Sequence, residues 1–89
     1  MNWSEINEPT KAIPYAYITC ETPLGTAQID WKSWEKVSAY EISVGDIYLG
    51  HKWNLEESKK LVEDWLIQIY KDLGDYLEQL KTNKINGGK

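Results

Sequence analysis

Side chains that could carry nucleophilic or acid–base chemistry are few in this chain of 89 residues, which holds one histidine, His51, and one cysteine, Cys20. A reactive thiol needs a neighbouring base and a lowered pKa, and a zinc site needs several His, Cys or carboxylate ligands. We expect His51 to end a strand on its inward face, and Cys20 to lie in the middle of another strand. Both are therefore expected to be structural, and the sequence predicts no catalytic residue, no metal site and no cofactor.

The fourteen Asp and Glu residues are the remaining candidates for acid–base chemistry. Paired carboxylates act as acid and base only where burial and closeness separate their pKa values. Half of these residues instead alternate with lysines along a predicted helix, which is typical of a solvated face. Phosphate-binding loops, dinucleotide motifs and zinc spacings are all absent. We therefore predict that the protein is not an enzyme.

The aromatic composition indicates binding instead of catalysis. The chain has five Trp, six Tyr and no Phe, and all ten of its basic residues are Lys. Trp and Tyr carry a polar N–H or O–H group, so they suit half-buried positions at core margins and interfaces. A net charge of −4 and the absence of Arg disfavour nucleic acid, because its binding depends on neutralised phosphates. A protein partner is expected.

The elements that must position these aromatic side chains are four short strands and one helix. Alternating apolar and polar residues predict strands at residues 13–22, 26–32, 39–44 and 47–51. Apolar residues then recur at helical spacing from Leu55 to Lys81, after Asn54 as N-cap. The predicted fold is α+β: a four-stranded antiparallel β-meander followed by one long C-terminal α-helix packed on one face. Residues 1–12 form an N-terminal arm, residues 13–81 the single domain, and residues 82–89 a flexible tail.

Two hairpin turns set the expected strand registers. Gly45 and Asp46 form the loop of the second hairpin. Its predicted cross-strand pairs are Val44 with Ile47, Ile42 with Leu49, and Tyr40 with His51. The first hairpin allows two registers. A two-residue loop pairs Ile18 with Ile29 and Cys20 with Ala27, whereas a three-residue loop pairs Tyr17 with Trp31. The two-residue loop is favoured, and it leaves Tyr15 and Tyr17 on the outer face of the sheet.

The predicted helix is longer than the sheet that it covers. It would span about 40 Å at roughly 1.5 Å per residue, whereas four strands make a sheet some 15–20 Å wide. Cover for the far end could come from the arm, through Trp3 and Ile6, or from antiparallel pairing with a second copy. A helix break at Gly74 is the third solution, but the apolar stripe keeps its phase there, which favours a continuous helix. The residues expected at a homodimer interface are Leu73, Tyr76, Leu77 and Leu80.

The aromatics left over from the core define the expected partner-binding surface. These residues are Tyr15, Tyr17, Trp34, Tyr48 and Trp53. The function predicted is a small acidic protein-binding module, and one concrete form is a virus- or mobile-element-encoded inhibitor that binds a host protein complex. The alternative is single-stranded nucleic-acid binding by stacking on the tyrosines of the sheet face. In outline alone, the predicted fold resembles the PUR single-strand-binding domains. No apolar run is long enough to cross a membrane, and the polar N-terminus and single cysteine favour the cytoplasm.

Overall fold

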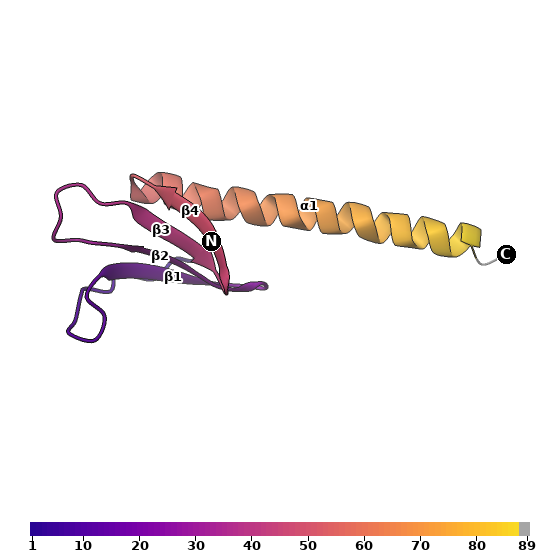
Figure 1. The fold of residues 1–89 in the computed structure, drawn as a ribbon. Helices are drawn as coiled ribbons and strands as arrows, with labels where there is room; N and C mark the ends of the chain where they lie inside the picture. The colour runs from indigo at the N-terminus through magenta and orange to yellow at the C-terminus, as the bar shows by residue number, and fades with distance from the viewer. Residues whose placement is uncertain (88–89) are drawn as a thin grey trace.

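The computed structural model describes residues 1–87, with side chains placed through residue 82. The chain forms β1 (Ala16–Thr22), β2 (Gly25–Trp31), β3 (Tyr40–Val44), β4 (Ile47–Lys52) and α1 (Leu55–Gly87) (Figure 1). The strands pair antiparallel in the order β1-β2-β3-β4, and α1 contacts β2, β3 and β4. The predicted four-stranded meander followed by one long helix is confirmed.

The core lies between α1 and the inner face of the sheet (Figure 1). The strands β1, β2 and β3 alternate buried and more exposed side chains, because successive residues point to opposite faces, whereas β4 has no buried residue. The buried hydrophobic residues are Ala16, Ile18, Cys20, Ala27, Ile29, Trp31, Ile42, Val44, Val62 and Leu66. The helix contributes only Val62 and Leu66 to this set, so its contact with the sheet is confined to its first half.

The N-terminal arm runs along the free edge of β1. The backbone of Ser4 donates to the Thr19 carbonyl oxygen at 2.8 Å, and Asn7 and Tyr17 exchange two backbone hydrogen bonds of 2.8 and 3.1 Å. Trp3 packs against the core. The arm therefore pairs with an edge that would otherwise present unpaired backbone groups to other chains.

The first hairpin has the favoured two-residue loop. Ile18 lies opposite Ile29, and Cys20 lies opposite Ala27, which confirms the prediction and excludes the three-residue alternative. The Thr22 hydroxyl closes the turn by donating to the Gly25 carbonyl oxygen at 2.6 Å. This register places Tyr17 opposite Asp30 on the outer face of the sheet.

The second hairpin has the predicted turn, but its strand register departs from the prediction further along β4. Val44 lies opposite Ile47 as expected, but the register then shifts by one residue. The observed pairs beyond this shift are Ile42 with Gly50, Glu41 with His51, and Tyr40 with Lys52. The predicted pairs of Ile42 with Leu49 and of Tyr40 with His51 are therefore wrong.

A β-bulge in β4 explains this difference. An extra residue in one strand shifts the alternation of every following side chain to the other face. Gly50, at φ +120°, has the backbone conformation that such an irregularity favours. His51 consequently lies exposed and opposite Glu41, an outer-face residue, so its predicted inward placement is wrong.

The helix α1 begins after a capped turn and continues without a break. The Glu57 backbone donates to Asn54 Oδ1 at 2.8 Å, as expected of an N-cap, and the helix passes through Gly74 as predicted. It extends to Gly87, beyond the predicted end at Lys81, while residues 88–89 of the predicted tail lie outside the described residues. Ile6 is exposed, so only one of the two expected arm anchors, Trp3, reaches the core.

The second half of α1 projects away from the sheet (Figure 1). Every residue at positions 70–82 is exposed, and the molecule measures 64 × 23 × 19 Å along its principal axes. Within the described part of the chain, no helix combines the length and apolar character needed to span a membrane. The far end of α1 therefore has no cover from its own chain.

Candidate partner-binding groove

A row of outer-face residues crosses all four strands and positions the candidate site. Tyr17 lies opposite Asp30, Asp30 opposite Glu41, and Glu41 opposite His51. The bulge in β4 completes this row, because it turns His51 towards the outer face. His51 then packs edge-to-face against Trp53, with ring centroids 5.6 Å apart. Two neighbouring carboxylates therefore lie at the centre of the row, with aromatic rings at both ends.

The connection between β2 and β3 builds one wall beside this row. The Lys32 backbone donates to Ser38 Oγ at 3.0 Å, which ties the two ends of the connection together. The Glu35 backbone donates to the Lys32 carbonyl oxygen at 3.1 Å, and the Lys32 ammonium lies 3.9 Å from the Glu35 carboxylate. This closed loop displays Trp34 and Val37, with exposed fractions of 61% and 74%.

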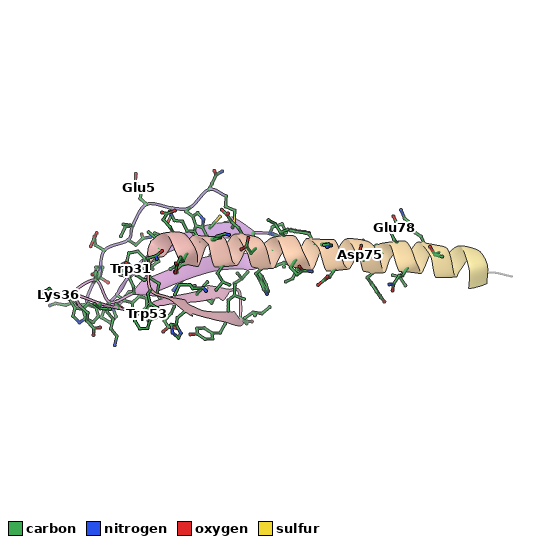
Figure 2. The ribbon with its side chains drawn as sticks, turned by 90° about the horizontal axis from the view of Figure 1, so that it is seen from above. Glu5, Trp31, Lys36, Trp53, Asp75 and Glu78 are labelled. Carbon is green, nitrogen blue, oxygen red and sulfur yellow. The ribbon has the colours of Figure 1, made fainter. Side chains whose placement is uncertain are left out.

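The row and the loop enclose a groove of about 610 Å³ at the end of the sheet where α1 begins. The aromatic and acidic residues of its lining are Tyr15, Asp30, Trp31, Trp34, Glu35, Glu41 and Trp53, and Lys32 also lines it. In Figure 2, Trp31, Trp53 and Lys36 gather at this end of the molecule, opposite the projecting end of the helix that carries Asp75 and Glu78. The volume falls within the range usual for sites that hold a small molecule or a few side chains.

Three carboxylates and one lysine line the groove: the Lys32 ammonium lies 3.9 Å from the carboxylate of Glu35, whereas Asp30 and Glu41 lie side by side on the sheet. Partial burial raises the pKa of Asp30 above its usual range. A hydrogen bond from Gln28 Nε2, at 3.3 Å, acts in the opposite direction, and nearby Glu41 raises the pKa further. Among the described residues, neither Asp30 nor Glu41 forms a salt bridge. Lys32 is paired with Glu35, so the groove combines aromatic surface with a net negative charge from Asp30 and Glu41.

Tyr48, which lies opposite Ser43 on the outer face of the sheet, contacts Glu41. Its hydroxyl donates a hydrogen bond to Glu41 Oε2. This bond raises the pKa of Tyr48 above its usual range, with smaller contributions from desolvation and from the charges of Glu41 and Asp30. The neutral phenol is thus retained as a donor, and it orients Glu41 at the edge of the groove.

The groove brings together three of the five aromatic residues predicted for partner binding. Tyr15, Trp34 and Trp53 line it, and Tyr48 adjoins it through Glu41. Tyr17 lies outside the lining, half-buried, with its ring 6.4 Å from that of Tyr15 in an edge-to-face contact. Partner binding by these residues remains a prediction.

Three groove residues, Asp30, Glu41 and Val37, were not predicted as site residues from the sequence. The favoured register of the first hairpin already placed Asp30 on the outer face, beside the tyrosines, and strand alternation placed Glu41 there too. The missing information was the path of the β2–β3 connection, since its closure by Ser38 depends on a contact that no periodic pattern reports.

The two residues considered first for chemistry do not meet in the structure. Cys20 is a buried free thiol in the core, whereas His51 is exposed on the outer face. Over the described residues, no group of three or more His, Cys, Asp or Glu side chains is arranged to hold a metal ion.

Comparison with models of known protein families, with curated proteins and with solved structures gave no match.

Proposed function

We propose that this protein is a small non-enzymatic binding module that takes a cationic side chain of a partner protein into its aromatic groove. The observation that carries the proposal is that Tyr15, Trp34 and Trp53 line one groove with Asp30 and Glu41, two carboxylates that form no salt bridge among the described residues. An enzyme would need a nucleophile or a base held by an orienting group, and this groove offers surface and charge instead.

The chemistry of the groove favours lysine, methylated lysine or arginine as the bound side chain. Aromatic faces attract cations by about 0.5–1 kcal/mol at exposed sites and about 2 kcal/mol when water is excluded. The apolar stem of such a side chain can lie against Trp34 and Val37, while its charged end approaches Asp30. One cation gives modest affinity, so the exposed loop must add further contact with the partner.

The overall charge of −4 suits the same class of partner, because it attracts a basic surface from a distance. A virus- or mobile-element-encoded inhibitor that occupies a basic site on a host protein complex is the concrete form that we propose. A cytoplasmic location agrees with a single, buried cysteine. Phosphate-bearing ligands are disfavoured, since Asp30 and Glu41 would repel them at the centre of the sheet face.

Binding of short peptides to the full chain tests this proposal. We expect peptides with lysine, trimethyllysine or arginine to shift the indole N–H signals of Trp34 and Trp53 in nuclear magnetic resonance spectra, and acidic peptides and single-stranded oligonucleotides to leave them unchanged. Trp34→Ala and Trp53→Ala should each weaken binding at least about tenfold, which corresponds to about 1.4 kcal/mol.

Leu24→Ala is the matched control. Leu24 is also an exposed large side chain, but it lies in the β1–β2 turn and is not part of the groove lining. This variant should bind as the unaltered chain does. Cationic peptides that bind equally well to both tryptophan variants would contradict the proposal, as would oligonucleotide binding at the groove.

A further inference from the structure

The projecting half of α1 carries an apolar surface that its own chain leaves uncovered. Leu66 is the last helical residue in the core, and all residues at positions 70–82 are exposed. Large apolar and aromatic side chains nevertheless continue along this part of the helix. They are Tyr70, Leu73, Tyr76, Leu77 and Leu80, with exposed fractions of 44–56%.

These side chains follow the spacing of a helix-pairing seam. Leu66, Leu73 and Leu80 recur every seven residues, and Ile69 and Tyr76 each follow one of them by three. Such alternation of three and four places a narrow apolar stripe along one side of a helix. The opposite side repeats charged residues at the same interval: Glu57, Asp64, Lys71 and Glu78. A helix that needs cover on a single side, over its whole length, has this pattern.

The stripe is continuous with the core of the domain. Val62 and Leu66, which pack against the sheet, belong to the same stripe as Leu73 and Leu80, and its phase is unbroken through Gly74. The sheet covers only the first half of α1, so the second half needs a different partner with a matching stripe. The corresponding half of a second copy offers one by symmetry.

The charges beside the stripe favour an antiparallel arrangement. Glu63 and Lys81 lie eighteen residues apart, about five helical turns, and so on the same side of α1. Neither forms a salt bridge among the described residues. Antiparallel pairing brings Glu63 of each copy towards Lys81 of the other, whereas parallel pairing keeps the two about 27 Å apart along the helix axis. It also places the two sheets at opposite ends, where they do not compete for space.

We propose that two copies of the chain form an antiparallel homodimer through the projecting half of α1, with the symmetry axis close to Leu73. In this arrangement Tyr70 lies near Tyr76 of the second copy, and the uncovered parts of the two stripes, from Tyr70 to Leu80, cover each other over about three helical turns.

The mass of the full chain in solution tests the pairing. Light scattering and sedimentation from low micromolar to near-millimolar concentration should give a mass that rises to twice the 10.4 kDa of the monomer. Leu73→Glu should reduce this mass to that of the monomer. Circular dichroism should still show the part of α1 that packs on the sheet, since glutamate is a good helix former. Thr82→Glu introduces the same charge on the opposite side of α1 and should leave the dimer intact.

The alternatives give different results. A monomer mass for the unaltered chain throughout this range would overturn the proposal and leave the stripe to a helix of another protein. A doubled mass that survives in Leu73→Glu would place the interface elsewhere on the molecule and would also overturn it.

Cysteine cross-linking tests the orientation. In a Cys20→Ala background, Glu63→Cys and Lys81→Cys chains should form a disulfide with each other when mixed, and neither should form one alone. Cross-linking of Lys81→Cys with itself, and none in the mixture, would show a parallel pair. Failure of the groove to bind peptides would leave these results unchanged, so the two proposals are separable.

Discussion

The position of Asp30 in the folded chain disfavours the ionised form of its carboxyl group. Burial and the neighbouring Glu41 both raise the pKa of Asp30, and only Gln28 acts to lower it. A group whose folded-state pKa is raised is more stable protonated, so stability is lost as pH rises from its usual pKa of 3.8 through the raised value. At neutral pH the ionised carboxylate therefore destabilises the fold. A cationic partner in the groove would offset this effect, which gives the carboxylate a functional explanation.

Asp30→Asn should consequently stabilise the free protein and weaken its binding to cationic peptides. Asn keeps the shape and an acceptor for Gln28 but has no charge. Because the carboxylate is only partly buried and solvent screens its charge, we expect a gain below about 1 kcal/mol at neutral pH. This gain should vanish when the pH falls below 3.8, where Asp30 is also neutral. Urea unfolding at several pH values measures it.

Glu8→Gln provides the comparison for a simple loss of charge. Glu8 lies exposed in the N-terminal arm and is not part of the groove lining. It should change neither stability nor peptide binding appreciably. A loss of stability at neutral pH in Asp30→Asn, or unchanged peptide affinity, would show that this carboxylate has a structural role instead.

At the scale of the elements, periodic patterns were sufficient for the strands, the first hairpin and the helix. Strand alternation and helical spacing each repeat over many residues, so one exception does not obscure them. The β4 bulge is a single insertion with no period of its own. Gly50 was the only local sign of it, and a glycine within a strand is compatible with several structures. Because this one inserted residue was not predicted, the predicted face of His51 and the predicted pairs beyond Ser43 were wrong.

Two glycines provide a matched test of this account. An added Cβ at Gly50 or at Gly74 would have no neighbouring atom within 4 Å, but only Gly50 has a positive φ, +120°. Gly50→Ala should therefore destabilise the fold by about 1–3 kcal/mol through backbone strain. Gly74→Ala lies in a regular helix and should stabilise it by about 0.8–1 kcal/mol.

Chemical unfolding followed by circular dichroism measures both changes. The signal of His51 in a nuclear magnetic resonance spectrum reports whether the bulge survives in Gly50→Ala. Equal and same-signed changes at the two glycines would mean that backbone conformation at Gly50 is not what holds the bulge.

For the whole molecule, the proposed dimer would carry two grooves at opposite ends of a helix pair. Two linked sites bind a partner with repeated basic segments more tightly than one site does, provided that both can be reached. The five uncovered side chains of the stripe are each about half exposed, so burial contributes roughly 1 kcal/mol apiece, on the order of 10 kcal/mol for two copies. The cost of association is of the same order, so we expect the dimer to dissociate on dilution.

Dissociation on dilution makes thermal stability depend on protein concentration. Residues 70–82 have no cover within one chain, so the stability of this half of α1 is coupled to association. By mass action, an equilibrium that forms dimers shifts towards the folded state as concentration rises. We expect the Tm of the unaltered chain and of Thr82→Glu to increase by a few degrees across the micromolar range, and the Tm of Leu73→Glu to stay constant. Scanning calorimetry at several concentrations measures this dependence, and a constant Tm for all three chains would mean that the projecting helix stands alone.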